Sequence, residues 1–363
     1  MHSRPLRLAA LVAAALIVAV TPTVAVGPPA TPPTGTSVGA TGLLDAASQV
    51  ASTVTAQVAS AVTVAASNPC SGSGSALRKT SNGSLTVLLL GSDYRNGAGS
   101  ERTDTVIVMN IGRNGRVAMA AIPRDTVQIP LANGGTSGSS RVNTLYQRYK
   151  RSSVGRKGVD CQALDHVRRD IAHTLGTQIP YYAFIRMDEF STLINYIGGI
   201  RMNVRYRLVD YHYTRRDRKV LVPKATNYLM RGSGGCYQGK YCRNALKYVR
   251  SRYGTEGGSA NNDFRRVRRQ QEVVYWAGRT VLDRGNGAKL TRLLNAAKSR
   301  VWTNLPKNAT GALALYGFVQ GARFAQSDGK VFGPSRWASK AGTYTYRLKL
   351  DDVRQWVDNH FKP

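Results

Sequence analysis

Three short apolar runs constrain the fold of this chain more than any other feature. They span Leu85–Leu90, Thr105–Ile111 and Val117–Ile122, and Gly, Asn or Pro bounds each of them. Runs of this length and composition are typical of strands that are buried on both faces of a sheet. Asn114-Gly115 stands between the second and third runs and favours a tight turn, so these two strands are expected to pair as a hairpin.

Helical patterns alternate with the apolar runs. Asp160–Leu175 carries apolar residues at helical spacing and is followed by Gly176, a natural helix stop. Asp263–Leu282 predicts a second helix, and the chain closes with a predicted strand, Tyr344–Leu350, and a predicted helix, Asp351–Phe361. Strands mixed with helices indicate an α/β domain in which helices cover both faces of a central sheet.

The N-terminal part differs in amino-acid composition from the rest of the chain. A basic start followed by the apolar run Leu8–Val20 is typical of a secretory signal. Because the run is short for a bilayer crossing, which needs about 20 apolar residues, residues 1–26 are either a cleaved signal peptide or a signal-anchor. Residues 27–83 read as a low-complexity linker with a possible stalk helix, and 84–363 as the folded domain. The expected location is extracytoplasmic, secreted or membrane-anchored.

The four cysteines are Cys70, Cys161, Cys236 and Cys242. A small even number in an exported chain indicates two disulfides. Cys236 and Cys242 bracket a short loop and are expected to pair, which leaves Cys70 with Cys161. A zinc site is the alternative, but no CxxC or HxxxH spacing supports it.

The charge balance points to a polyanionic partner. The chain has 51 Lys+Arg against 20 Asp+Glu, a net charge of +31, and residues 201–270 alone hold 18 basic and 4 acidic residues. Nucleic acid, an anionic membrane surface and a phosphate-rich glycopolymer would all fit such an excess. Arginine dominates the motifs of this stretch, and guanidinium groups pair with phosphate oxygens. Nucleic acid is not expected because the chain carries an export signal.

Charged clusters stand at one end of each apolar run. Asp93 follows the first run, Arg102 and Asp104 precede the second, and Arg124 and Asp125 follow the third. If the second and third strands are antiparallel, their clusters share one sheet edge, where scaffolds commonly present functional groups. Asp93 and Asp104 flank a single loop and could share Mg²⁺. The alternative is that these aspartates cap turns and pair locally with the neighbouring arginines.

A second charged group lies in the basic stretch. Arg250 and Arg252 would point the same way if the chain is extended there. The helix from Asp263 is expected to place further polar residues on one stripe, and Arg265 and Arg268 on another, solvated side. The residues expected on the stripe are Asp263, Arg266, Arg269 and Gln270.

Two common catalytic motifs are missing. The chain contains neither a GxxxxGK[ST] loop nor a GxSxG elbow, and its five histidines are scattered. A nucleotide-dependent kinase and a serine hydrolase are therefore disfavoured.

Several motifs in order resemble the LytR-CpsA-Psr family of cell-envelope glycopolymer transferases. The resemblance runs from about Leu85 to about Phe361, and the Gly/Ser/Asn-rich segment Gly254–Asn262 and the Cys236–Cys242 loop depart from it. It is carried by residues 88–95, 102–105, 122–126, 141–143, 198–200, 245–252 and 263–271.

The resemblance implies a three-layer α/β/α fold with a central mixed sheet and a hydrophobic cavity for a polyprenyl chain. It implies that Asp93 and Asp104 hold Mg²⁺ and that arginines grip a pyrophosphate, with Asp93 or Asp125 as candidates to take a proton. The implied pyrophosphate-binding residues are Arg102, Arg124, Arg250, Arg252 and Gln270, with Arg266 and Arg269 in support.

The implied activity is transfer of a glycopolymer phosphate from a polyprenyl-pyrophosphate carrier to a cell-wall acceptor, peptidoglycan in the first place, at the membrane surface. Two alternatives remain: a phosphohydrolase that cleaves the lipid pyrophosphate with water, and a non-catalytic polyanion-binding envelope protein. Segment Gly254–Asn262 is long enough to act as a mobile flap.

Overall fold

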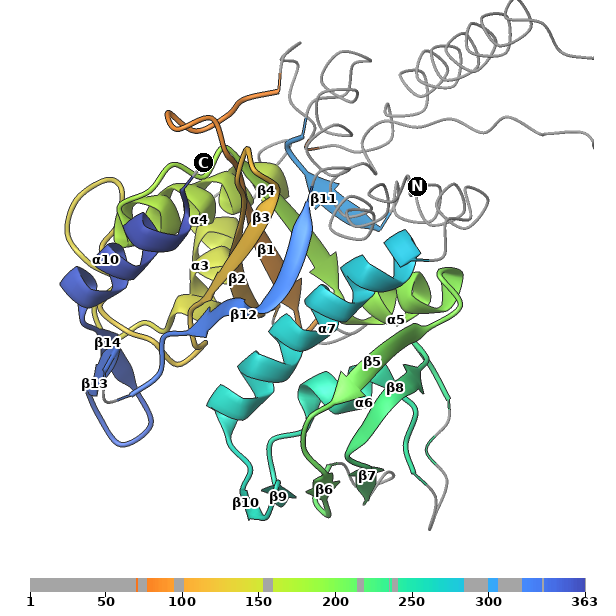
Figure 1. Ribbon diagram of the computed structural model, residues 1–363. Coiled ribbons are helices and arrows are strands. Elements are labelled where there is room, and N and C mark those ends of the chain that lie inside the picture. The colour runs from red at the N-terminus through yellow and green to blue at the C-terminus, as the bar shows by residue number, and fades with distance from the viewer. Residues whose placement is uncertain are drawn as a thin grey trace, which may run out of the picture.

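The computed structural model describes residues 70, 77–94, 101–152, 159–213, 219–234, 236, 241–283, 300–305, 322–334 and 336–362. The expected signal segment and stalk helix, within residues 1–69, lie outside these residues. The described chain forms a six-stranded mixed sheet with helices on both faces (Figure 1). The expected α/β fold is therefore confirmed.

The central sheet has the strand order β11-β4-β1-β2-β3-β12. Strand β1 pairs antiparallel with β2 and parallel with β4, β3 pairs parallel with β12, and the pairs β2–β3 and β4–β11 are antiparallel. The strands span β1 Leu85–Ser92, β2 Thr103–Ile111, β3 Arg116–Ala121, β4 Tyr181–Arg186, β11 Val301–Thr303 and β12 Arg323–Val331.

The strand pairing brings four strand ends to one edge of the sheet. The predicted β2–β3 hairpin is confirmed, and Gly115 takes the positive φ of 80° that its turn requires. Ser92, at the end of β1, is paired both with Thr103 at the start of β2 and with Arg186 at the end of β4. The loops that follow β1, β3 and β4 and precede β2 therefore meet at this edge.

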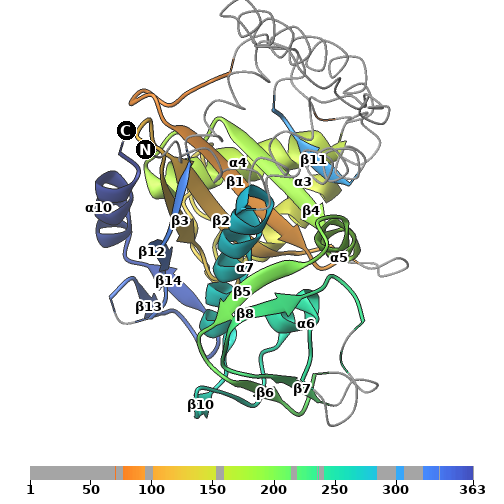
Figure 2. The same cartoon turned by 45° about the vertical axis from the view of Figure 1, so that its right-hand side comes forward.

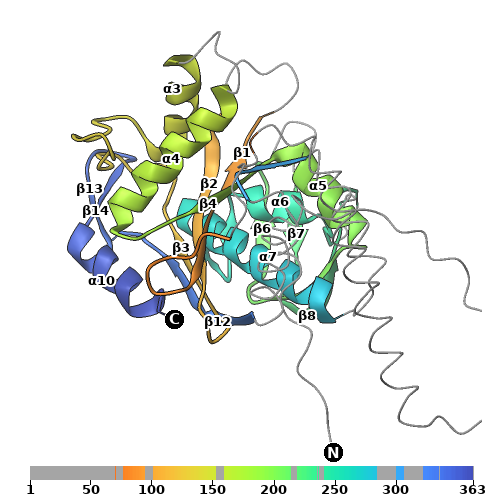
Figure 3. The ribbon, with the colours of Figure 1, turned by 90° about the horizontal axis from the view of Figure 1, so that it is seen from above.

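One face of the sheet is covered by helices from the middle and the end of the chain (Figures 1 and 3). Leu88 and Leu90 of β1 pack in one apolar cluster with Val167 and Trp356. The predicted middle helix and C-terminal strand and helix are confirmed within a few residues. The elements of this face are the 3₁₀ turn η2 Val142–Thr144, α3 Leu145–Ser152, α4 Val159–Leu175, β13 Ala338–Lys340, β14 Tyr346–Leu348 and α10 Leu350–His360.

The other face is covered by the long helix α7, Asp263–Asp283, as the sequence predicts. It runs between the sheet and a group of short strands (Figure 2). The other elements here are α5 Met187–Tyr196, β5 Ile200–Val204, β6 Leu208–Asp210, β7 Val220–Val222, β8 Ala225–Met230, α6 Ala245–Arg250, β9 Thr255–Glu256 and β10 Ser259–Ala260.

Segment Gly254–Asn262 is a hairpin rather than the expected mobile flap. Its strands β9 and β10 pair with each other, and β9 also pairs with β6. The hairpin thus extends the small sheet β10-β9-β6-β7.

Both expected disulfides are present. Cys70 is bonded to Cys161 in α4, across 91 residues of chain, and Cys236 to Cys242, across 6 residues. All four cysteines therefore form disulfide bonds, with the pairing expected from their spacing. Among the residues described here, no helix has the length and apolar content to cross a bilayer.

The two disulfides are expected to contribute unequally to stability. A crosslink restricts the unfolded chain more when it closes a longer loop, so removing Cys70–Cys161 should cost at most about 4–5 kcal/mol and removing Cys236–Cys242 about 2 kcal/mol. Urea unfolding of the Cys70→Ala/Cys161→Ala and Cys236→Ala/Cys242→Ala variants measures both losses. A larger loss from the second pair would contradict this expectation.

Candidate active site

A cavity of about 560 Å³ lies between the sheet and α7. Its apolar wall comes from the middle of the strands and from the helices, for example Leu89, Ile107, Phe190 and Val273. Its polar wall comes from the strand ends that meet at the sheet edge. The cavity is therefore apolar along its length and charged at that edge, which matches the expected hydrophobic cavity.

Seven of the eleven site residues expected from the sequence line this cavity. They come from both charged groups, the strand ends and the α6–α7 region, which are more than 120 residues apart in the chain. These seven are Asp93, Asp104, Arg124, Arg250, Arg252, Arg266 and Gln270.

Asp104 is the centre of the charged wall. Its Oδ2 accepts a hydrogen bond from Nη1 of Arg124 at 2.7 Å and lies 3.6 Å from Nη1 of Arg266. Its Oδ1 accepts from Nδ2 of Asn143 at 2.9 Å. Burial opposes ionisation, but Arg266, Arg124 and the Asn143 hydrogen bond outweigh it and hold the pKa of Asp104 below its usual value. Asp104 is therefore an ionised carboxylate at neutral pH.

Asp263, at the start of α7, supplies a second counter-charge. Its Oδ1 lies 3.0 Å from Nη2 of Arg266 and 3.5 Å from Nε of Arg124. Two arginines and two aspartates thus alternate at the wall. Nε of Arg266 and Oε1 of Gln270 are buried and find no hydrogen-bond partner among the described residues. Buried polar atoms of this kind are costly, so they point to a polar ligand in the cavity.

Asp93 faces the cavity beside Asp104. Its Oδ1 accepts the backbone N–H of Arg102 at 2.8 Å. Burial raises the pKa of Asp93, and the charge of Asp104 raises it further. A cation shared by the two carboxylates would offset both effects, so the pair fits a divalent metal. In the described part of the chain no three His, Cys, Asp or Glu side chains form a fuller metal cluster. Other ligands would thus be water or substrate oxygens, as Mg²⁺ prefers.

Arg102 and Asp125 lie near the cavity without lining it. The side chain of Arg102 is exposed, and the residue contributes its backbone N–H to Asp93. Asp125 lies between two arginines, with Oδ2 at 3.5 Å from Nε of Arg124 and Oδ1 at 3.1 Å from Nη1 of Arg141. Their expected roles at the site stay predictions.

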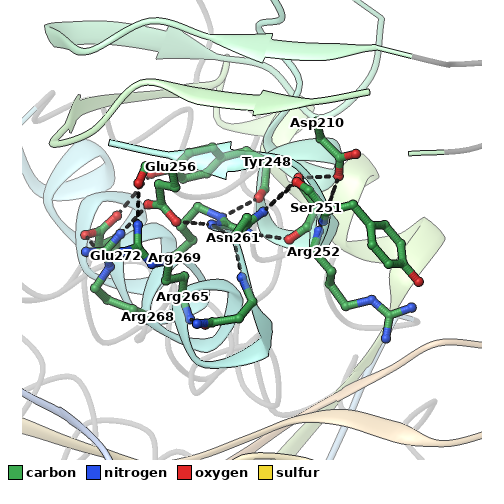
Figure 4. Close-up of polar contacts among 12 residues, drawn as sticks. Asp210, Tyr248, Ser251, Arg252, Glu256, Asn261, Arg265, Arg268, Arg269 and Glu272 are labelled. Carbon is green, nitrogen blue, oxygen red and sulfur yellow. Dashed lines mark hydrogen bonds and ion pairs between the residues drawn. The ribbon is translucent and has the colours of Figure 1, made fainter. Parts of the chain in front are cut away.

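Arg269 does not point into the cavity, and its expected place on the stripe with Asp263 is wrong. Six residues along an α-helix correspond to a rotation of about 240°, which turns Arg269 to another side. The side chain is 0% exposed and donates to the carbonyl of Tyr248 at 2.9 Å, to Asn261 Oδ1 at 3.1 Å and to Glu256 (Figure 4).

Arg265 and Arg268 lie away from the cavity, as expected, but they are not simply solvated. Arg265 donates to the backbone carbonyl of Glu256, and Arg268 pairs with the carboxylate of the same residue. Glu256 is 1% exposed, and its buried carboxylate is neutralised by Arg268 and Arg269, while Arg265 holds the backbone of the β9–β10 hairpin.

Buried Asp210 fixes the backbone that carries Arg252. Its Oδ2 accepts from Ser251 Oγ at 2.5 Å and from the backbone N–H groups of Arg252 and Tyr253 at 3.3 Å each. Arg250 ends α6 rather than lying in extended chain, and the chain leaves the helix at Ser251, where ψ is 135°. Figure 4 shows the guanidinium of Arg252 directed away from the group around Arg269.

Four important residues were not assigned a role from the sequence: Asn143, Arg186, Asp210 and Glu256. Asn143 stands in one of the family motifs. Asp210 and Glu256 are two of only four acidic residues in the basic stretch 201–270. Their rarity among so many basic residues could have identified them as buried counter-charges. Arg186 also lines the cavity and pairs with buried Glu101 at 2.8 Å, but only its place at the end of a strand could have indicated it.

Comparison with known proteins supplies independent information. The chain is 24% identical over 282 residues to the polyisoprenyl-teichoic acid–peptidoglycan teichoic acid transferase TagV of Bacillus subtilis, which covers 76% of this chain and 64% of TagV. The crystal structure of B. subtilis TagV matches with a TM-score of 0.52 over 77% of this chain and 97% of that one. A structure of TagT bound to LIIa-WTA matches with a TM-score of 0.51 at 18% identity, over 79% of this chain and 99% of that one.

These structural likenesses establish a shared fold. The sequence model of the LytR_cpsA_psr family matches residues 46–332, well over half of the 363 residues. Beyond residue 332 the chain still belongs to the folded unit, because Trp356, Val357 and Phe361 pack in the core. The chain therefore belongs to the LytR-CpsA-Psr family.

Proposed function

We propose that this protein transfers a glycopolymer phosphate from a polyprenyl-pyrophosphate carrier to a hydroxyl group of a cell-wall acceptor, peptidoglycan in the first place. One observation carries the proposal: an apolar cavity ends in a wall of arginines and aspartates. A polyprenyl chain fits the apolar part, and a pyrophosphate fits the guanidinium groups of Arg124, Arg252 and Arg266. The family membership and the likeness to TagV support the same activity.

The reaction follows from the chemistry of the carrier. The acceptor hydroxyl oxygen attacks the phosphorus that bears the glycan. A new P–O bond forms, the bond from that phosphorus to the bridging oxygen breaks, and the electron pair leaves with polyprenyl phosphate. The products are a phosphodiester between acceptor and glycan, and a lipid monophosphate. The hydroxyl proton passes to a base or to solvent.

The arginines would stabilise the negative charge that develops on the bridging oxygen. Arg124 and Arg266 are held in place before the reaction by Asp104 and Asp263, so little reorganisation of these two side chains is needed when charge moves. Asp93 and Asp104 would hold Mg²⁺, which would neutralise charge on the phosphate oxygens. Asp125, which does not line the cavity and pairs with Arg124 and Arg141, is the weaker candidate for the base.

We further propose that the protein acts outside the cytoplasm, next to the membrane that contains the lipid carrier. The signal pattern of residues 1–26 and the two disulfides support this location. Anchoring and secretion both agree with the pattern.

A direct assay tests the proposal. The purified protein is incubated with Mg²⁺ and a polyprenyl-pyrophosphoryl glycan, with and without peptidoglycan. Transfer predicts covalent glycan–peptidoglycan product and release of lipid phosphate that depends on the acceptor. Release without acceptor would favour the phosphohydrolase, and unselective polyanion binding without turnover would favour the binding protein.

Arg252→Ala is expected to lower the transfer rate by at least about 100-fold, the loss typical of removing one donor to a developing oxyanion. The fold should be retained because Arg252 lines the cavity and contacts buried Asp210 through its backbone N–H, which alanine keeps. Rates are compared with thermal melting curves. A wild-type rate in Arg252→Ala would remove this residue from the site.

Arg269→Met should behave differently although the residue is only 17 positions away. It leaves the buried carboxylate of Glu256 without one of its partners, and breaking a buried ion pair typically costs about 3–5 kcal/mol of stability. We expect a large fall in the free energy of unfolding, measured in urea. An unchanged stability with a lost rate would instead return Arg269 to the substrate-binding residues.

Asp93→Asn is expected to weaken Mg²⁺ binding, measured by titration calorimetry, while Asp351→Asn, an exposed control in α10, should have no effect. Because the pKa of Asp93 is raised above 3.8, protons compete with the metal at higher pH than for an ordinary aspartate. Binding to the wild-type protein should therefore weaken on acidification before pH 3.8 is reached. Equal Mg²⁺ affinity of wild type and Asp93→Asn would contradict the metal assignment.

A further inference from the structure

Three tyrosine–cation pairs gather at one lip of the cavity. The Nζ of Lys219 lies 5.3 Å from the ring centre of Tyr211, and the guanidinium carbons of Arg250 and Arg252 lie 5.7 and 5.6 Å from the rings of Tyr213 and Tyr253. These distances are typical of cation–π contacts. We call this group the tyrosine lip.

One buried carboxylate holds the two chain segments of the lip together. Asp210 ends β6, and its Oδ1 accepts the backbone N–H of His212 at 2.9 Å, while its Oδ2 accepts from Ser251, Arg252 and Tyr253. The turn that carries Tyr211 and Tyr213 is thereby joined to the loop that carries Tyr253. Lys219 is in place because Val220, its neighbour, pairs with Asp210 in the β6–β7 ladder. The lip is therefore a built part of the fold.

The lip continues the site outward. Tyr213, Arg250, Arg252 and Tyr253 line the cavity, whereas Tyr211 and Lys219 do not. Tyr211 and Tyr253 are 54% and 52% exposed, so their rings are open to a ligand. A ring presented in this way, beside the group that would bind a pyrophosphate, has the shape and surface to stack on a sugar.

The charge of the lip selects the kind of sugar. Among the residues of the lip that the structure describes, the one acidic group is Asp210, which is 0% exposed and fully used in hydrogen bonds to the backbone and to Ser251. The other charged side chains described in the lip, Lys219, Arg250 and Arg252, are all positive. Lysine acts on phosphate and carboxylate groups as a point charge, with less geometric demand than arginine.

We propose that Tyr211, Lys219 and Tyr253 form a glycan subsite directly outside the pyrophosphate site, and that it takes a sugar of the donor that carries a negative charge, as phosphate or carboxylate. The rings contact the faces of the sugar, and Lys219 pairs with its anionic group. The inference rests on the proposed function for the position of the donor's pyrophosphate.

The test measures binding and does not require turnover. Two soluble probes are compared, farnesyl-pyrophosphoryl disaccharides that are identical except for one phosphate group on the second sugar. The wild-type protein is expected to bind the phosphorylated probe about two- to fivefold more tightly, the range of an exposed ion pair, and added salt should reduce this preference.

The variants separate charge from stacking. Lys219→Met should remove the preference for the phosphorylated probe and leave the affinity for the neutral probe unchanged. Lys219→Arg should keep the preference. Tyr211→Ala should lower the affinity for both probes by a similar factor. Tyr344→Ala is the matched control, because Tyr344 is 75% exposed and lies between β13 and β14, away from the cavity lining.

Equal affinity of the wild type for both probes, or a preference that survives in Lys219→Met, would overturn the proposal. So would a Tyr211→Ala variant that binds both probes as the wild type does. If the probes bind with the expected pattern while no transfer to peptidoglycan occurs, the subsite stands and the proposed transfer fails. If the wild type transfers glycan, Arg252→Ala abolishes this transfer, and the wild type shows no preference for the phosphorylated probe, the proposed transfer stands and the subsite fails.

Discussion

Arginines at the wall of an apolar cavity require neighbouring carboxylates to balance their charge, and several elements of this structure supply those carboxylates. A buried guanidinium loses its hydration, and neighbouring guanidiniums repel each other, so without counter-charges the wall would come apart. Asp104 and Asp263 meet the requirement for Arg124 and Arg266. The two carboxylates come from β2 and α7, so the ion cluster also fixes how the helix lies on the sheet.

A second ion cluster has a different task. Glu256 gathers Arg265, Arg268 and Arg269 on the side of α7 that faces away from the cavity. Because Arg269 also donates to backbone carbonyls at Tyr248 and Ser251, the cluster joins α7, α6 and the β9–β10 hairpin. Four arginines in five positions of one helix thus divide into one that faces the cavity and three that build the support behind it. Their sequence alone looks like a uniform basic patch.

The sequence predicts the layered fold well because alternating runs and turn signals are local. The β2–β3 hairpin, α4 and α7 each follow from residues that are neighbours in the chain. The gathering of Asp93, Asp104 and Arg124 at one edge also follows, since it depends on strand direction alone. The partners of buried charges could not be predicted in this way. Glu256 contacts Arg269 because the tertiary fold places the β9–β10 hairpin beside α7. Which arginines of α7 face the cavity depends on the rotation of each position around the helix, and not on their order in the motif.

The Cys70–Cys161 bond has a consequence for how the domain is held. Without it, the first described contacts of the N-terminal chain would be those of Leu77, which packs against the core, and of Arg78, which bonds Tyr181 and Pro180 at the start of β4. That is the sheet edge opposite the charged wall. Cys161 stands next to Asp160, which is joined through Lys150 and Glu101 to Arg186 at the cavity. The bond therefore holds Cys70 on the sheet face that carries α4, near the end of the sheet where the charged wall lies and not at the cavity itself. If the N-terminal segment is held at a membrane, this bond would attach the domain near the end of the sheet where the charged wall lies.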